Sequence, residues 1–123
     1  MIQVGSPMPR KQQANLLKQT RQMKAYVEKN YIRDLKLADL SKSFNYSQGH
    51  ISRLFRDQLG IGFVECLTLA RLRSAKRLLR RTRIPIYEIA GRSGFNFRDY
   101  FFKVFKKAEG ITPREYRQIH LND

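Results

Sequence analysis

Two clusters of residues recur at helical spacing in the sequence, and in each most side chains can form hydrogen bonds and at least one is positively charged. The residues are Gln48, Gly49, Ser52 and Arg53 in the first cluster, and Arg98, Asp99, Phe102 and Lys103 in the second. Side chains of these types form hydrogen bonds with base edges, and an α-helix that carries them fits the major groove of a DNA duplex. The chemistry that both clusters offer is therefore recognition.

Patterns for catalysis or metal binding are missing from the sequence. His50 and His120 lie far apart, and Cys66 is the single cysteine, so neither a zinc site nor an internal disulfide is expected. We expect the lone thiol to be a small buried hydrophobe. The sequence has no glycine-rich phosphate loop, no nucleophile elbow and no pair of carboxylates at catalytic spacing. We expect neither an enzyme nor a cofactor.

The charge balance indicates a polyanionic partner. The chain has 123 residues, with 25 Lys and Arg against 10 Asp and Glu, which gives a formal net charge of +15. Such an excess favours nucleic acid first, an anionic membrane surface second and an acidic protein third. The sequence shows no signal peptide and no apolar run near the ~18 residues that a membrane span requires. We expect a cytoplasmic, nucleoid-associated protein.

Apolar periodicity and capping residues predict an all-α fold. Ser47 and Asn96 are expected N-caps, Gly60 and Gly110 are expected to end helices, and Thr112 opens a capping box. Residues 1–13 are expected to form a flexible tail or the remnant of a linker. The seven predicted helices lie at about 15–30, 37–44, 47–59, 63–80, 86–92, 96–108 and 112–120.

The sequence contains an internal repeat, and each copy consists of a short helix, a tight turn and a longer helix. The turn residues are of types that tolerate a left-handed backbone, and the pattern predicts a helix-turn-helix in each copy. The corresponding residues are Leu37, Leu40, Ser41, Asn45, Tyr46, Ile51, Leu54, Phe55, Gly60 and Ile61 in the first copy, and Ile86, Ile89, Ala90, Gly94, Phe95, Phe101, Val104, Phe105, Gly110 and Ile111 in the second.

Three stretches, "ARLRSAKRLL", "IYEIAGRSGF" and "YFFKVFKKAEGITPREYR", resemble the paired helix-turn-helix domain of the AraC/XylS transcription regulators. The resemblance covers about residues 35–117. It implies seven helices in a homeodomain-like arrangement, with a DNA-binding domain over 14–120. That domain would hold one helix-turn-helix at about 36–59, a linker helix at about 62–80 and a second helix-turn-helix at about 84–108.

The same resemblance implies base-reading positions. They are Gly49, Ser52 and Arg53 in the first copy, and Arg98, Asp99 and Lys103 in the second, with Phe102 beside them and Gln48 as a further candidate. The sequence departs from the family pattern at Gly49, which offers no side-chain donor, and at Phe102. The phenyl ring of Phe102 can either contact a thymine methyl group or pack half-buried. The carboxylate of Asp99 can accept from a cytosine amino group or stabilise a helix N-terminus.

Between Glu65 and Glu88 the sequence has several basic residues and no acidic one. Some of these basic residues are expected to contact phosphates. Arg71 and Arg73 flank packing positions, so internal hydrogen bonds are an alternative to phosphate contacts for both. The predicted phosphate-binding residues are Arg56, Lys76, Arg77 and Lys106.

These observations predict sequence-specific binding of double-stranded DNA at a promoter, by a domain that is monomeric on its own. The resemblance implies activation through contact with RNA polymerase. Two unlike reading helices on one chain predict an asymmetric site made of two different boxes. The alternatives are a small basic RNA-binding protein, which would favour exposed aromatic rings, and a protein whose amphipathic basic helices bind a membrane surface or a peptide groove.

Overall fold

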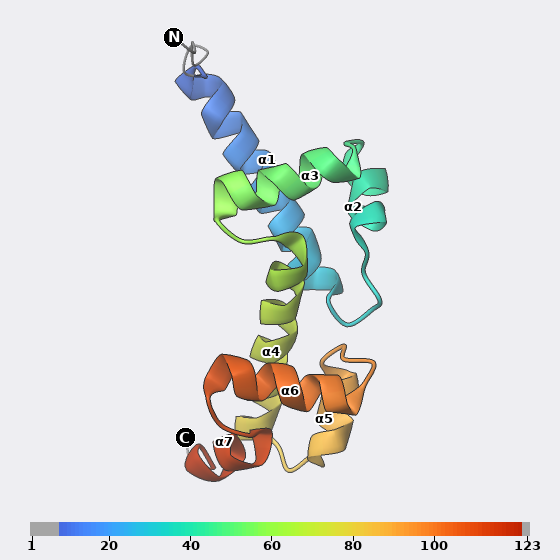
Figure 1. The fold of residues 1–123 in the computed structure, drawn as a ribbon, viewed down its shortest axis with the longest axis vertical. Coiled ribbons are helices and arrows are strands. Elements are labelled where there is room, and N and C mark those ends of the chain that lie inside the picture. The colour runs from blue at the N-terminus through green and yellow to red at the C-terminus, as the bar shows by residue number, and fades with distance from the viewer. Residues whose placement is uncertain (1–7, 122–123) are drawn as a thin grey trace. The chain divides into compact units, whose positions relative to one another are not determined.

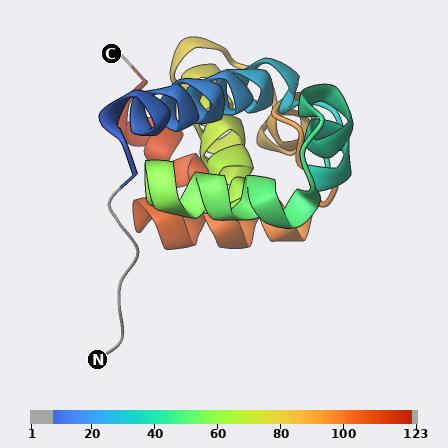
Figure 2. The same ribbon diagram turned by 90° about the horizontal axis from the view of Figure 1, so that it is seen from above.

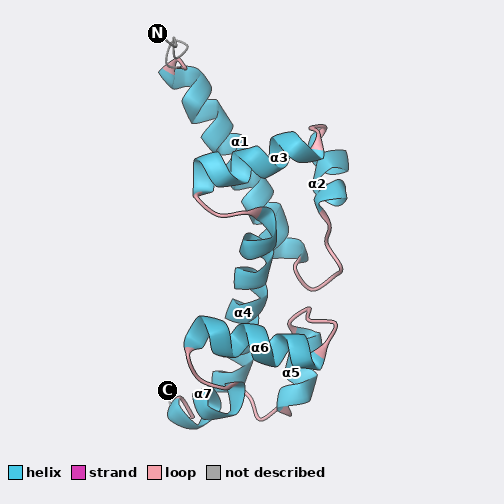
Figure 3. Cartoon of the chain, in the orientation of Figure 1, coloured by secondary structure: helices cyan, strands magenta, loops and turns pink. Residues whose placement is uncertain are grey.

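The chain is helical throughout its described part. The computed structural model describes residues 8–121, and over that range it contains seven α-helices and no strand (Figure 1, Figure 3). None of the helices in this range is both long and apolar enough to cross a bilayer. The predicted all-α class is confirmed for these residues. The elements are α1 (Arg10–Asn30), α2 (Leu37–Phe44), α3 (Gln48–Leu54), a π-helical segment η1 (Phe55–Leu59), α4 (Phe63–Arg81), α5 (Ile86–Arg92), α6 (Arg98–Glu109) and α7 (Pro113–Ile119).

The described residues form two compact units. The first unit comprises the chain up to Tyr26 together with Lys36–Phe63. The second comprises Val27–Leu35 together with the chain from Val64 onward. Each unit therefore contains one of the two predicted helix-turn-helices, α2–α3 in the first and α5–α6 in the second.

The core of the first unit is built from the apolar stripe of α3 and its neighbours. Ile51, Leu54 and Phe55 lie at the i, i+3 and i+4 positions of one helix face, and all three are buried. Leu40 of α2 and Met23 of α1 are fully buried in the same unit. Seen from above, α1 and α3 run along opposite sides of this unit and α2 lies at one end (Figure 2). Burial of this stripe leaves the opposite face of α3 in solvent.

Local chemistry fixes the ends of α3 and η1. Asn45 has a φ of 58°, the left-handed conformation that its type was predicted to tolerate. The side chain of Ser47 then accepts a hydrogen bond from the amide of His50 at 3.1 Å, so the predicted N-cap is confirmed. Gly60, with a φ of 75°, ends η1 as predicted.

The core of the second unit is aromatic. The ring of Phe101 lies 5.0 Å from that of Phe95 and 5.8 Å from that of Phe105, measured between centroids. Tyr116 of α7 meets Phe105 edge-on at 5.5 Å. Fully burying one such ring contributes roughly 1.5–3 kcal/mol, and the rings fix α6 on the unit. The buried residues of this core are Leu72, Ala75, Leu79, Ile89, Ala90, Phe95, Phe101, Phe105 and Tyr116.

The C-terminal helix α7 begins with the predicted capping box. The hydroxyl of Thr112 accepts from the amide of Glu115 at 3.1 Å, and the amide of Thr112 donates to a carboxylate oxygen of Glu115 at 3.0 Å. Pro113 occupies the first turn, where its missing N–H leaves no bond unmade. The two hydrogen bonds lower the pKa of the Glu115 carboxyl, because they favour its ionised form.

Two helix starts differ from the predictions. The helix α1 begins at Arg10, five positions before Asn15, because its first turn consists of good helix formers and Pro9 accepts from the amide of Gln13 at 3.0 Å. Residues 10–13 are thus helical where a tail was expected, and residues 1–7 lie outside the described range. The predicted cap at Asn96 is wrong. The backbone is still extended at Phe97, so Phe97 is the N-cap of α6, without a side-chain cap bond.

Candidate nucleic-acid interface

The solvent face of α3 carries the first predicted cluster. Gln48, Gly49 and Arg53 are exposed, and Ser52 is half-buried. Gly49 and Arg53 lie on the side of the helix opposite the buried stripe, whereas Gln48 and Ser52 lie beside the stripe. The structure therefore brings the four predicted residues together on one accessible face that starts at the N-terminal turn.

The Arg53 side chain lies along the helix beside Gly49. A Cβ atom added at Gly49 would lie 3.5 Å from Nη1 of Arg53, which is ordinary van der Waals contact. The guanidinium group therefore lies back towards the first turn of α3. A methyl group at position 49 would contact this group without displacing it.

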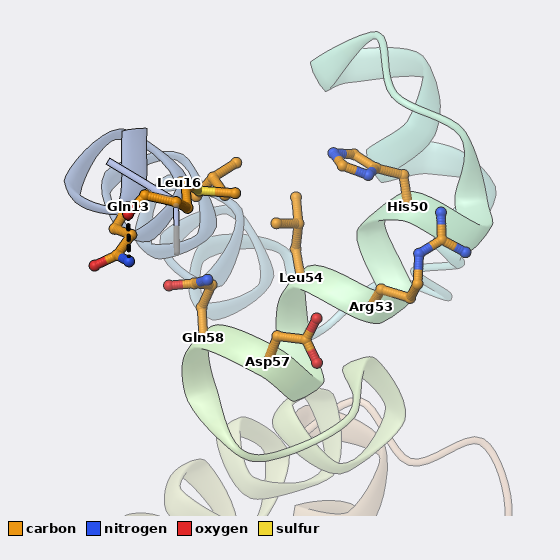
Figure 4. A pocket seen from close by; sticks show the side chains of 8 residues that line it. Gln13, Leu16, His50, Arg53, Leu54, Asp57 and Gln58 are labelled. Atoms are coloured by element: carbon orange, nitrogen blue, oxygen red, sulfur yellow. Dashed lines mark hydrogen bonds between the residues drawn. The ribbon is translucent and has the colours of Figure 1, made fainter. Parts of the chain in front are cut away.

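A pocket of mixed polarity adjoins Arg53 in the first unit (Figure 4). His50 and Arg53 extend from α3, whereas Asp57 and Gln58 extend from η1, and the Arg53 guanidinium points away from the Asp57 carboxylate. Within residues 8–121, His, Cys, Asp and Glu side chains do not gather in groups of three that could hold a metal ion. The lining residues are Met8, Gln13, Leu16, His50, Arg53, Leu54, Asp57 and Gln58.

The solvent face of α6 carries the second predicted cluster. Arg98, Asp99 and Lys103 are exposed. Phe102 is 36% exposed, and its ring lies 5.6 Å from that of buried Phe101. Phe102 thus packs on the core with one part of its ring and meets solvent with the rest. Asp99 lies in the first turn of α6, where a carboxylate also stabilises the helix N-terminus.

Exposed aromatic rings surround the N-terminal end of α6, and the sequence analysis did not single them out. Tyr87 is 60% exposed, Phe97 is 72% exposed and Tyr100 is 50% exposed. The guanidinium carbon of Arg98 lies 5.4 Å from the centre of the Tyr87 ring, within the range of a cation–π contact. This contact restrains Arg98 beside the reading face. The exposure of Tyr87 could not be predicted from the sequence, because it lies next to Ile86 and one turn before buried Ala90.

Two shallow hollows flank Phe102, and basic residues line both. Phe102 and Arg114 line the two hollows in common. Sequence reasoning missed Arg114, although its place directly after the predicted Pro113 start put it in the exposed first turn of α7. These positive charges surround a few apolar groups. They suit a partner whose backbone is negatively charged and also carries apolar groups. The basic residues of the two hollows are Arg98, Lys103, Lys106, Lys107, Arg114 and Arg117.

Some basic residues of α4 are occupied within the second unit. The ammonium group of Lys76 lies 3.2 Å from a carboxylate oxygen of Glu109, and both side chains are largely buried. Arg80 donates to the hydroxyl of Tyr116 at 2.7 Å. Arg77 is exposed. Of the two phosphate candidates on α4, Arg77 is accessible and Lys76 shares its charge with a carboxylate.

The other two phosphate candidates are accessible. Arg56 is exposed on η1, and Lys106 is exposed on α6, one turn beyond Phe102. Each follows one of the two predicted clusters towards the C-terminus, Arg56 on the segment that continues α3 and Lys106 on α6 itself. The arrangement gives each unit a hydrogen-bonding surface with a cation beside it.

Comparisons with known proteins agree with this architecture. A family model described as a helix-turn-helix domain matches residues 40–119. YpdC of Escherichia coli K12, described as an uncharacterized HTH-type transcriptional regulator, is 34% identical over 91 residues, which are 74% of this chain and 32% of YpdC. The chain thus spans about a third of the length of that relative.

Solved structures show the same fold. The C-terminal domain of AraT, a response regulator from Geobacillus stearothermophilus, is 36% identical with a TM-score of 0.78, over 88% of each chain. A transcriptional regulator from Chromobacterium violaceum, described as AraC-type DNA-binding domain-containing, is 25% identical with a TM-score of 0.77, over 89% of this chain and 96% of that one. The chain belongs to the AraC-type helix-turn-helix family, as its motifs predicted.

Proposed function

We propose that the chain binds double-stranded DNA in a sequence-specific manner, as the DNA-binding domain of a transcription regulator. The observation that supports this most is that α3 and α6, the second helices of two helix-turn-helices, both present hydrogen-bonding side chains to solvent. The net charge of +15 adds attraction to phosphates. YpdC is described as a regulator of the same general kind.

In the first unit, Arg53 is the principal base reader. Its guanidinium group can form a bidentate pair with guanine, which discriminates between bases by roughly 1–3 kcal/mol. Ser52 and Gln48 assist with single hydrogen bonds. Gly49 contributes no donor and leaves the helix narrow where it enters the groove.

In the second unit, the reading face is more varied chemically. Arg98 and Lys103 donate to guanine, Asp99 accepts from a cytosine amino group, and the exposed part of Phe102 contacts a thymine methyl group. Tyr87 assists by restraining Arg98 through the cation–π contact.

Phosphate contacts supply the part of the affinity that does not depend on sequence. We assign them to Arg56, Arg77 and Lys106, which are exposed, and in smaller measure to Lys76, because Glu109 competes for its charge. The logarithm of the binding constant should then fall with the logarithm of salt concentration, with a slope of about −0.9 for each phosphate contacted. Arg77→Ala should make this slope less steep by about 0.9, the contribution of one phosphate, and Lys76→Ala should change it by less.

The test of this function is competition for one labelled promoter duplex. Unlabelled duplex of the same sequence should displace it at much lower concentration than unpaired RNA or anionic phospholipid vesicles. The comparisons give no support to the alternative of an RNA-binding protein, although the exposed rings of Tyr87, Phe97 and Tyr100 are of the type that stacks on unpaired bases. Equal displacement by RNA would refute the proposal, as would a salt slope near zero.

The role of the whole protein extends this proposal. We propose that it activates transcription in the cytoplasm through contact with RNA polymerase, and that one copy of this domain occupies one asymmetric site. Titration of the domain with a saturating duplex should give one chain per duplex. Transcription in vitro, with the site beside a promoter, should rise in the presence of the full-length regulator. A palindromic optimum bound by two chains would contradict the monomeric mode.

A further inference from the structure

The connection between α1 and α2 passes over the turn of the second helix-turn-helix. This connection lies in Val27–Leu35, which belongs to the second unit, and both of those end residues are buried. Gly94, in the turn between α5 and α6, is buried with a φ of 94°. A Cβ atom added at Gly94 would overlap the carbonyl oxygen of Tyr31 and would lie 3.1 Å from Cα of Ile32. The two backbones therefore touch, and a side chain at position 94 would separate them.

Arg71 of α4 joins this connection to the unit. Its Nε atom donates to the carbonyl of Tyr31 at 2.8 Å, and its Nη2 atom donates to the carbonyl of Arg33 at 3.0 Å. The Nε atom would also lie 3.0 Å from a Cβ atom at Gly94. Burial lowers the pKa of the Arg71 guanidinium, and the charges of Asp34 and Tyr100 act in the opposite direction. A guanidinium group remains charged at neutral pH in such a site, so both bonds are charge-assisted.

The turn that this contact supports determines where α6 begins. The amide of Gly94 donates to the carbonyl of Gly91 at 3.0 Å, and the amide of Phe95 donates to the carbonyl of Ala90 at 2.9 Å. The buried ring of Phe95 then lies 5.0 Å from that of Phe101 in α6. Contacts therefore run from Arg71 through the 31–33 backbone and the turn into the helix that carries the second cluster.

We infer that Arg71 is a positioning residue that holds α6 in its reading orientation and so sets the base preference of the second unit, without touching DNA itself. The inference rests on the proposed function. It assigns this half-buried arginine, which is one of the basic residues of α4, to internal hydrogen bonds of the unit, in agreement with the alternative that the sequence left open. Loss of its bonds would loosen the turn. The exposed side chains of α6 would then be unchanged in type, but they would no longer be held in the orientation that matches the bases.

The experiment compares Arg71→Ala with Arg73→Ala. Arg73 is a matched control, because it lies on the same helix, carries the same charge, and reaches the last turn of α1, just before the connection, through an exposed ion pair with Glu28 at 3.2 Å. Affinities are measured for the optimal duplex and for duplexes altered in one box at a time. For Arg71→Ala we expect the preference at the second box to fall at least fivefold while that at the first box is kept. For Arg73→Ala we expect all duplexes to weaken alike.

Arg71→Lys separates position from charge. Its ammonium group keeps the charge but cannot reach two carbonyls in the fixed fork of a guanidinium, so we expect it to lose preference at the second box too. Hydrogen exchange of the α6 amides should be faster in Arg71→Lys than in Arg73→Lys, and this milder pair serves if Arg71→Ala does not fold. Equal effects on both boxes, or unchanged α6 exchange in Arg71→Lys, would overturn the inference.

The failure of the proposed function would look different. If the unaltered protein shows no base preference in any duplex, sequence-specific binding is refuted. The exchange comparison between Arg71→Lys and Arg73→Lys then still decides whether Arg71 positions α6.

Discussion

The two helix-turn-helix units share a backbone plan and differ in how their turns and outward helices are built. Both turns contain a left-handed residue, which is Asn45 in the first unit and Gly94 in the second. Asn45 is exposed, whereas Gly94 is buried against the backbone of Tyr31. The helix α3 has a side-chain cap and changes to a π-helix over Phe55–Leu59, whereas α6 has no side-chain cap and is α-helical to its end.

The outward faces differ more than the inward ones. Both inward faces carry large apolar residues at the same helical spacing, as the predicted repeat required. The outward face of α3 carries one guanidinium group beside small or polar residues, whereas that of α6 combines several charges with aromatic rings. The two copies share the residues that form the core and differ in the residues that face solvent. If both faces bind DNA as proposed, the two boxes of the site should be unlike in sequence.

The largest expected effect comes from separating the two boxes of the site. Insertion of half a helical turn of DNA between them places the boxes on opposite sides of the duplex, so one unit should lose its base contacts. Because one bidentate pair alone discriminates by roughly 1–3 kcal/mol, affinity should fall about tenfold or more. Fluorescence anisotropy with a series of spacers measures this, and a full-turn insertion serves as control. Undiminished affinity in every spacer would show that only one unit reads DNA.

Arg53→Ala and Lys103→Ala should each affect one box only. We expect Arg53→Ala to cost roughly 1–3 kcal/mol at one base pair of the first box and to relax the preference there, because a guanidinium pair is lost. Lys103→Ala should act in the same sense on the second box, and less strongly, because an ammonium group is a point donor. Selection from a random duplex pool shows both. A uniform loss on matched and mismatched sites would reassign Arg53 to phosphate.

Gly49→Ala should stabilise the first unit. Alanine exceeds glycine in helix propensity by up to about 1 kcal/mol, and the added methyl group meets only Arg53 at 3.5 Å. Thermal unfolding measures the gain. Gly60→Ala is the contrasting control, because Gly60 has a φ of 75° and an alanine there would be strained despite the open space around it. A destabilised Gly49→Ala would mean that the Arg53 guanidinium cannot accommodate the methyl group.

Replacement of thymine by uracil should lower the binding affinity by a smaller amount, and in the second box only. Uracil lacks the methyl group that Phe102 is proposed to contact, and loss of one buried methyl group costs about 0.8 kcal/mol, or roughly fourfold in affinity. We expect this loss for one thymine of the second box and no loss in the first box, whose helix α3 has no exposed Phe, Tyr or Trp. In Phe102→Ala, the uracil and thymine duplexes should bind equally. A loss confined to the first box would contradict the assignment.

The smallest effect concerns pH. The capping bonds lower the pKa of Glu115 in the folded chain, so its ionised form stabilises α7 above the ordinary carboxyl pKa, and this contribution is lost as pH falls through the lowered value. Glu115→Gln can keep the bond from Thr112 and cannot titrate. The melting temperature of the variant should therefore change slightly less than that of the unaltered chain between neutral and acidic pH. Parallel curves would show that the cap contributes nothing measurable.

Local sequence signals predicted most helix ends, because those ends depend on residues near them. Ser47, Gly60 and Thr112 act through bonds or dihedral angles within a few residues, and all three predictions were confirmed. The prediction that Asn96 is the N-cap of α6 was wrong, although asparagine is a suitable residue type, because the chain remains extended for one more residue. The start of α1 was also misplaced, since polar helix formers at Arg10 give no apolar period.

Long-range partners could not be predicted in the same way. The ion pair of Lys76 with Glu109 and the bonds of Arg71 to the carbonyls of Tyr31 and Arg33 join residues distant in sequence. The sequence indicated only that Arg71 flanks packing positions. The two candidate base-reading clusters were predicted as groups, since helical periodicity places the residues of each close together on one helix. The ring of Tyr87 beside Arg98 depends on how α5 packs against α6.

The contact between Arg71 and Tyr31 also has a consequence for the order in which the chain is made. Arg71 follows Tyr31 by 40 residues. At the roughly 5–20 residues per second of protein synthesis, Tyr31 waits about 2 to 8 s for the arginine that will hold its carbonyl, and longer for Gly94. Val27 and Leu35, which are buried in the finished unit, remain open to water during this interval. Nascent chains stalled before Gly94 should therefore expose an apolar segment to chaperones, and chains stalled after α7 should not.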